Sequence, residues 1–383
     1  MSASSLEWKL LLAGTATSPA QGELAISLLA KHDQAVDWPS LLRCADFHGT
    51  SSLLYKNLSL ASGAAPGEVL ESLRQRYVEN VQKSLFLARE LNRILDCLHG
   101  HGIELISYKG IVLSEIYYAD IAMRQGGDID LFVRKPDVIR TRTTLRELEY
   151  IPCMEIPENS EADYIASGYE YSFDSPAGKH LLEMQWALQP RYYAVDYDMD
   201  GLFARAVEVT VAGCSLKVPS PEDLLVVLCV HAAKHLWGRL IWLCDIAQIL
   251  RRGNLDFDSI LTRAHELGIA RILHVTLLLA NAFLGTPIPA AIDPAVRSDR
   301  AAHALAEEVA SSIVAGVLWE DHKIPYFRLM MRLRERRSHQ IRFLTRLAFT
   351  PGPGEWQAVK LPRALSPLYR AVRMARLAAR FSR

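Results

Sequence analysis

The sequence lacks the marks of membrane and secreted proteins. Its longest uninterrupted apolar stretch, Leu224 to Val230, is far shorter than the roughly 20 residues that a membrane-spanning helix needs. The N-terminal residues carry no basic segment followed by an apolar run of signal-peptide length. The six cysteines are scattered without a CxxC pair, which argues against a disulfide framework or a zinc knuckle. We therefore expect a soluble cytoplasmic protein with no membrane span.

A net charge is also absent, since 43 Lys and Arg balance 43 Asp and Glu. The distribution is uneven, however. Residues 323–383 hold fifteen basic and two acidic side chains, a net +13, so the preceding 322 residues carry −13. Such a basic C-terminal region is suited to RNA, anionic lipid or another acidic partner. Its arginines alternate with apolar residues, which equally fits helices that pack one stripe and solvate the other face.

The types of predicted element change along the 383 residues, a length that allows two or three domains. Helix signals begin at Asp37 and again near Pro66, and the second helix ends at Gly100. Short strands then alternate with helices, until Ser220 and Pro221 open a second helical stretch. We predict a helical region over 1–100, an α/β core over 101–218, and a helical domain with a basic tail over 219–383.

Within the core, strands are predicted at 103–107, 128–133, 169–173 and 180–186, and helices follow the first two. The last two strands are joined by a strong turn signal at residues 174–178. Residues 152–168 are predicted to form a polar loop. The fold class is therefore α+β, with a small mixed sheet flanked by helical regions.

Two aspartates, Asp128 and Asp130, alternate with apolar residues on the second predicted strand. Residues i and i+2 of a strand share a face, so both carboxylates project together while Ile129, Leu131 and Val133 enter a core. Adjacent ionised carboxylates raise each other's pKa, and a hard cation relieves the repulsion. Because Mg²⁺ prefers one or two carboxylates plus substrate phosphates, the pair predicts a metal site for phosphate chemistry.

Other residues of the core fit the same chemistry. Lys109 and Gly110 lie at a strand-to-helix turn, where unpaired N–H groups and a lysine suit a phosphate. Arg124 precedes the acids by four positions and could reach a phosphate oxygen, and Glu183 lies on a later strand. Each alone has an ordinary explanation as a turn, an ion-pair partner or a solvated strand residue. Their combination with Asp128 indicates a site.

Taken together, Lys109-Gly110, Arg124 and Asp128-Ile129-Asp130-Leu131 resemble the signature of the polymerase-beta-like nucleotidyltransferase superfamily. They resemble more closely a bacterial family of uncharacterised nucleotidyltransferases. The resemblance covers nearly the whole chain, and its further segments are Asp37-Trp38, 45–49, 221–225, 231–237, 242–247, Leu361-Pro362 and 368–370.

The resemblance implies a small mixed-sheet nucleotidyltransferase core and a two-metal mechanism. Asp128 and Asp130 would hold two Mg²⁺ ions, and Glu183 would be the third carboxylate, a metal ligand that helps to deprotonate the acceptor hydroxyl. Lys109 and the backbone of Gly110 would hold the triphosphate. The reaction would move an NMP from an NTP to an unidentified acceptor, which could be a small molecule, peptide, protein or RNA, and release pyrophosphate.

Two departures from the superfamily pattern stand out. The usual Gly-Gly or Gly-Ser turn is Lys109-Gly110 here, with a longer gap to the acids, and Gln185 occupies a position where close relatives often carry histidine. The alternative function is a non-catalytic nucleotide- or RNA-binding protein with the same fold. The presence of all three acids favours the enzyme.

A helical segment of the C-terminal domain contributes further candidates. His231, Lys234 and His235 share one helix face, and Asp245 follows on the next helix. In one interpretation this face closes over the nucleotide, with Lys234 reaching phosphate and the histidines contacting the acceptor or base. In another, both histidines are core residues hydrogen-bonded to Asp245. Zinc binding by the histidine pair is a third, but it lacks an obvious third ligand.

Overall fold

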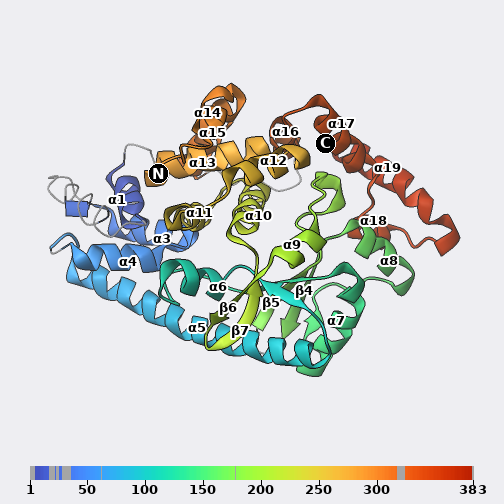
Figure 1. The fold of residues 1–383 in the computed structure, drawn as a ribbon, viewed down its shortest axis with the longest axis horizontal. Helices are drawn as coiled ribbons and strands as arrows, with labels where there is room; N and C mark the ends of the chain where they lie inside the picture. Colours follow the sequence, from blue (N-terminus) through green and yellow to red (C-terminus); the bar gives the residue numbers. More distant parts are fainter. Residues whose placement is uncertain are drawn as a thin grey trace.

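The protein combines many helices with a five-stranded mixed sheet, so the predicted α+β class is confirmed (Figure 1). All six cysteines lie in described parts of the chain, and none forms a disulfide. The computed structural model describes residues 5–16, 22, 26–27, 36–61, 63–176, 178–316 and 324–381.

Four helices with defined bounds precede the sheet in the described residues, and the last of them is the longest in that part of the chain. The side chain of Asp37 accepts the N–H of Ser40 and so caps the second of these helices, as predicted. The 34-residue helix α5 ends at Gly100 and runs beneath both the N-terminal helices and the sheet (Figure 1). The bounds are α1 (Leu6–Gly14), α3 (Trp38–His48), α4 (Ser51–Leu60) and α5 (Gly67–Gly100).

The sheet has the strand order β1-β2-β5-β4-β3, in which β2 and β5 are parallel and the other pairs are antiparallel. Its elements are β1 (Leu105–Ser107), α6 (Ile111–Leu113), the π-helix η1 (Ser114–Tyr118), β2 (Ile129–Val133), η2 (Lys135–Asp137), α7 (Val138–Leu145), η3 (Arg146–Leu148), β3 (Ile151–Pro152), α8 (Glu158–Ser167), β4 (Glu170–Ser175) and β5 (Gly178–Gln185).

The two faces of the sheet pack against different parts of the protein. Ile129, Leu131 and Val133 are at most 5% exposed and pack in one apolar cluster with the buried stripe of α5, as the alternation predicted. On the other face, Phe132 joins a second cluster that contains the helices of the N- and C-terminal regions. Asp130 lies on this second face, between the sheet and the helical regions.

The prediction of a polar loop over 152–168 was wrong for most of its length, because α8 occupies Glu158–Ser167. The helix is anchored by Tyr164, whose ring meets those of Trp186 and Trp356 edge-on. A single aromatic anchor produces no apolar periodicity, so the pattern alone gave no helix signal.

Between the sheet and the C-terminal helices lie η4 (Arg191–Tyr193), α9 (Met199–Arg205) and a hairpin that the sequence analysis missed. The hairpin pairs β6 (Val207–Val211) with β7 (Cys214–Val218). Ala212 and Gly213 form its turn, and both have positive φ.

The C-terminal half is helical, and Ser220 caps its first helix by accepting the N–H of Asp223. No helix in the described residues is long and apolar enough to cross a membrane. The bounds are α10 (Pro221–Lys234), α11 (Leu240–Arg252), α12 (Phe257–Leu267), α13 (Ala270–Leu284), α14 (Asp293–Ser298), α15 (Arg300–Ala315), α16 (Ile324–Arg332), α17 (Arg337–Phe349), α18 (Pro353–Ala358), η5 (Arg363–Leu368) and α19 (Tyr369–Phe381).

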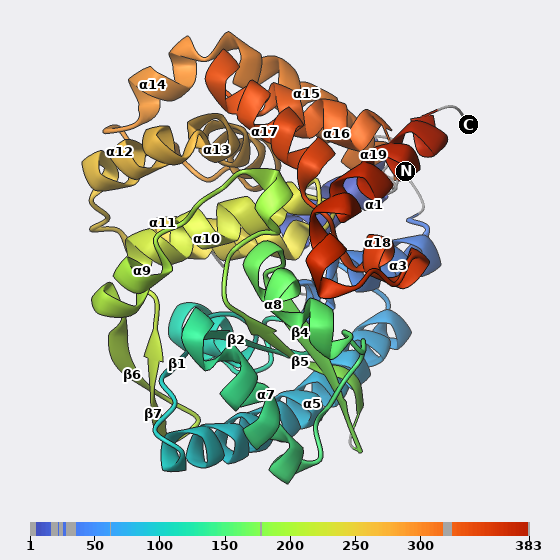
Figure 2. The same ribbon diagram turned by 90° about the vertical axis from the view of Figure 1, so that its right-hand side faces the viewer.

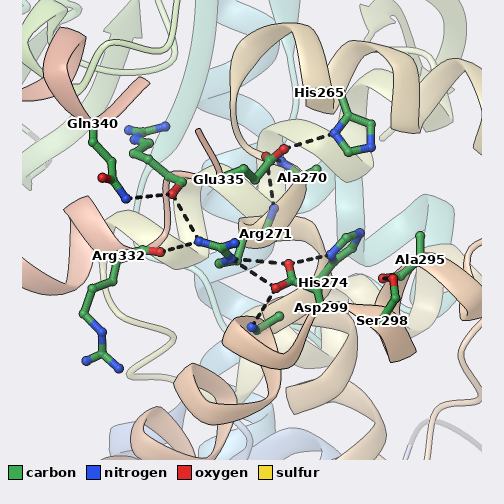
Figure 3. Close-up of polar contacts among 12 residues, drawn as sticks. His265, Ala270, Arg271, His274, Ala295, Ser298, Asp299, Arg332, Glu335 and Gln340 are labelled. Atoms are coloured by element: carbon green, nitrogen blue, oxygen red, sulfur yellow. Dashed lines mark hydrogen bonds and ion pairs between the residues drawn. The ribbon is translucent and has the colours of Figure 1, made fainter. Parts of the chain in front are cut away.

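One junction holds the basic tail against the other helices of the C-terminal half (Figure 3). Glu335, between α16 and α17, accepts the N–H groups of Ala270 and Arg271 at the start of α13. In return, Arg271 donates to the carbonyl oxygens of Arg332 and Arg334 at 2.9 and 3.1 Å. Each segment therefore satisfies backbone groups at a helix end of the other.

Several arginines of the basic tail are matched by acids from earlier elements. Arg332 lies 2.6 Å from Glu308, and Arg346 donates to both carboxylate oxygens of Asp196 at 2.6 and 2.8 Å. These internal ion pairs neutralise part of the positive charge of the basic tail. They favour the interpretation in which the tail packs against the protein over one in which it serves as an open RNA-binding surface.

Candidate active site

Three carboxylates meet on the helix-facing side of the sheet. Asp128 directly precedes β2, Asp130 lies within it, and Glu183 is the register partner of Asp130 on the parallel strand β5. One oxygen from each residue lies within 4.8 Å of the others. The structure thus brings together the three acids that the sequence singled out.

The carboxylates perturb one another electrostatically. Burial, and then the charge of Asp130, raises the pKa of Asp128 above its usual range. The same two causes raise the pKa of Glu183 to about 8, although Lys109 opposes them. A cation with a preference for oxygen ligands would relieve this repulsion, so the donor set fits Mg²⁺.

Lys109 supplies a positive charge inside this group. Its Nζ lies 2.7 Å from Oδ1 of Asp130, and both side chains are buried. Burial alone would lower the pKa of Lys109, but Asp130, Tyr108 and Glu183 together outweigh burial and raise it. The ammonium group therefore stays charged and partly balances the acids.

Two glycine turns touch each other beside the acids. Gly110 has φ +53°, and a methyl group there would come within 3.3 Å of the carbonyl oxygen of Asp128. A methyl group on Gly126 would come within 3.6 Å of Cα of Gly110 and 3.5 Å of Nη1 of Arg124. The backbone at both turns is thus bare of side-chain bulk, and a guanidinium lies next to it.

A lysine that the sequence analysis missed lies at the same place. A methyl group on Gly127 would come within 3.5 Å of Nζ of Lys83, an exposed residue of α5. No sequence signal marks Lys83, because α5 carries many charged residues on its exposed face. Only the packing of α5 beneath the loop before β2 brings this lysine to the site.

Arg124 was predicted to reach a phosphate oxygen. The structure places its guanidinium between Asp245 and the turn at Gly126. Its Nε lies 3.0 Å from both carboxylate oxygens of Asp245 on α11, and the Tyr118 hydroxyl donates to the same carboxylate at 2.9 Å. The Nη1 atom lies on the side of Gly126. Asp245 therefore anchors Arg124 beside the glycine turns.

His231 and His235 lie at the C-terminal end of α10, with ring centroids 4.9 Å apart and both beside Trp242. Asp245 bonds to Arg124 and Tyr118, and no hydrogen bond joins it to either histidine within the described chain. Within the described chain, neither histidine belongs to a group of three potential metal ligands.

The electrostatics of these histidines place them near Lys109. Burial, together with the charges of Lys234 and Lys109, lowers the pKa of His235 to about 3. Burial, and then Lys109, also holds the pKa of His231 well below its usual value. The charge of Lys109 acts on both rings, so this end of α10 lies near the lysine that pairs with Asp130. Both imidazoles are neutral at pH 7.

Lys234 and Gln185 both contact residues at the start of β4, next to the strand that carries Glu183. Lys234 lies over the ring of Tyr169, 4.4 Å from its centroid, and bonds to its hydroxyl. The amide of Gln185 donates to Glu183 at 3.2 Å and to Glu170 at 3.3 Å. Tyr169 and Glu170, at the start of β4, were not predicted as site residues. Their only sequence signal is their place opposite the Glu183 strand.

A family model described as an uncharacterised nucleotidyltransferase matches residues 34–285. The chain belongs to this nucleotidyltransferase family. The match contains the whole sheet, all three carboxylates and helices α10 to α13, while α14 to α19 lie beyond it. No curated protein and no solved structure matches the chain.

Proposed function

We propose that this nucleotidyltransferase moves an NMP from an NTP to an acceptor hydroxyl in a Mg²⁺-dependent reaction. The observation that carries the proposal is the convergence of Asp128, Asp130 and Glu183 on one face of the sheet beside Lys109. Mg²⁺, when held by these carboxylates, would neutralise charge on the attacking and leaving oxygens.

In the proposed step, the acceptor oxygen attacks the α-phosphorus of the NTP and a new O–P bond forms. The bond from the α-phosphorus to the bridging oxygen breaks, and pyrophosphate leaves with the electron pair. Glu183 takes the hydroxyl proton. Glu183 faces Asp130 across the β2–β5 pair, and this position beside the proposed metal site supports the role.

The order of strands suggests how the two substrates are arranged. Lys109 and Gly110 follow β1, the aspartates belong to β2, Glu183 lies on β5, and Glu170 lies on β4. We assign the triphosphate to the β1 side, where Lys109, the glycine backbone and Arg124 offer donors and positive charge. The acceptor then approaches from the β4 side. Lys83 would add a phosphate contact, and His231, Lys234 and His235 would border the nucleotide.

Asp128→Asn tests this assignment most cleanly. Asp128 is partly exposed, whereas Asp130 also holds the buried Lys109. We expect transfer of α-labelled NMP to fall by at least about a hundredfold, because the variant lacks one carboxylate ligand of the proposed Mg²⁺. Its melting temperature should stay the same or rise, since the substitution relieves repulsion among the acids.

The assay incubates the protein with each α-labelled NTP, Mg²⁺ and a cell extract, and follows which molecule acquires label. Asp96→Asn, an exposed substitution elsewhere on α5, serves as the matched control and should transfer label like the wild type. Full turnover by Asp128→Asn with an unchanged melting curve would overturn the proposed function.

A further inference from the structure

A cavity of about 1020 Å³ lies between the start of β4 and the C-terminal helices. Segments far apart in the sequence form it: the end of α8, the start of β4, the start of α16, residues 350–355 and α19. The corresponding elements are neighbours over one side of the sheet (Figure 2). Its volume suits a small organic molecule, for which sites usually measure about 300–1,000 Å³.

The inner end of this cavity adjoins the carboxylates. Tyr169 and Glu170 line it, and Gln185 bridges Glu170 to Glu183 through bonds of 3.3 and 3.2 Å. The body of a molecule in the cavity therefore lies one layer of side chains from Glu183, and a substituent has to extend past Glu170 to reach that carboxylate. This is the β4 side of the acids, opposite the glycine turns beside Lys109.

The walls are aromatic and apolar, and include Tyr192, Phe327, Ile324 and Leu377. Their charged residues balance in number, since Glu170 and Glu355 face Arg373 and Arg376, and Glu355 lies 3.5 Å from Arg373 and 3.2 Å from Arg376. Nucleic acids need a surplus of positive charge to neutralise phosphates, and the described lining residues provide none. An uncharged ligand with an aromatic ring complements such a wall.

We infer that this cavity is the acceptor site, and that the acceptor is a small uncharged molecule with an aromatic ring and a hydroxyl group. The inference rests on the proposed function and specifies its second substrate. The ring packs against the aromatic wall to which Phe327 and Tyr192 contribute, and the hydroxyl extends past Glu170 to reach Glu183. Its oxygen forms the bond to the α-phosphorus, its proton passes to Glu183, and pyrophosphate departs.

The first test measures binding without catalysis. The probe is 2-(2-naphthyl)ethanol, a fluorescent uncharged aromatic alcohol. Ile324→Asp introduces a charge into the wall at a side chain that is 53% exposed, so the fold should tolerate it. We expect the Kd of the probe to rise at least tenfold and the Kd of the NTP with Mg²⁺ to stay unchanged. Ile341→Asp, at a 62% exposed position outside the cavity lining, is the control and should leave both constants unchanged.

The second test supplies α-labelled NTP, Mg²⁺ and either the probe, a polyol or RNA. Label on the naphthyl alcohol, reduced at least tenfold by Ile324→Asp, supports the inference. Label on RNA or the polyol alone, or equal probe binding by wild type and Ile324→Asp, overturns it and leaves the proposed function standing. Failure to bind any NTP with Mg²⁺ overturns the proposed function instead, and a probe Kd that Ile324→Asp still raises would then mark the cavity as a binding site only.

Discussion

Replacing Asp245 with leucine should destabilise the protein by about 3–5 kcal/mol, the usual cost of breaking a buried ion pair. The Arg124 and Asp245 side chains are only 6% and 1% exposed, and their contact is 3.0 Å. Without Asp245, the guanidinium is buried with no carboxylate, and the Tyr118 hydroxyl loses its acceptor. An arginine cannot relieve this situation by losing its proton.

The converse change, Arg124→Met, should cost less. Burial already raises the pKa of Asp245 despite Arg124, so the carboxyl can take up a proton once the guanidinium is gone. Its folded pKa then lies further above the unfolded value, and the variant binds more protons when folded. Its deficit in unfolding free energy should therefore be smaller at pH 5.5 than at pH 8. The double variant Arg124→Met/Asp245→Leu should recover most of the stability, because an apolar pair can replace a buried ion pair.

Urea unfolding followed by far-UV circular dichroism measures these free energies, and the double-mutant cycle isolates the coupling between the two residues. Nucleotide affinity adds a second readout. If Nη1 of Arg124 contacts phosphate, the double variant regains stability but still binds NTP weakly. A loss below about 1 kcal/mol for Asp245→Leu would refute the reasoning about buried charge.

Four further outcomes can be checked. Glu335→Ala should lower the unfolding free energy by about 1–3 kcal/mol, since two N–H groups of α13 lose their acceptor, whereas Glu335→Gln should lose less; equal urea midpoints would contradict this. Gly110→Ala should cost about 1–3 kcal/mol of backbone strain and weaken NTP binding, measured as Kd, because φ is +53° and the methyl group would press on Asp128. Glu183 has a folded pKa of about 8 against an ordinary 4.5, so metal-free protein should lose stability as pH rises from about 4.5 to 8, and Glu183→Gln should flatten that slope. His235 has a folded pKa of about 3 against 6.5, so stability should fall as pH drops below 6.5, and His235→Gln should flatten that limb in urea titrations at several pH values.

Features with a local cause were predictable from the sequence. The helix starts at Asp37 and Ser220 depend on side chains that bond to N–H groups three residues later. The pairing of Asp128 with Asp130, and the burial of Ile129 behind them, depends on the period of a strand. Such patterns involve only a few neighbouring residues, so they do not depend on how distant segments pack.

Other features could not be predicted because they lack a local signal. Helix α8 is held by the contacts of Tyr164 with rings that are distant in the sequence. The hairpin β6–β7 is an exception, because residues 207–211 and 214–218 alternate apolar and polar side chains around an Ala-Gly turn, and this local signal was not recognised. Lys83 reaches the loop before β2 only because α5 passes beneath it. The role of Gln185 as a bridge is evident only in the tertiary structure, where its amide donates to both Glu183 and Glu170.

By itself, the sequence determined which side chains are the candidates for the chemistry, through residue types at strand and turn spacings together with the family resemblance. The tertiary structure alone decided how they are arranged. It places β5 parallel to β2, so that Glu183 lies beside Asp130, it anchors Arg124 on Asp245, and it forms a cavity with balanced charges beside Glu170. The physical reason is that spacing along a strand is set by covalent geometry, whereas pairing between distant segments is set by how the whole chain buries its apolar faces.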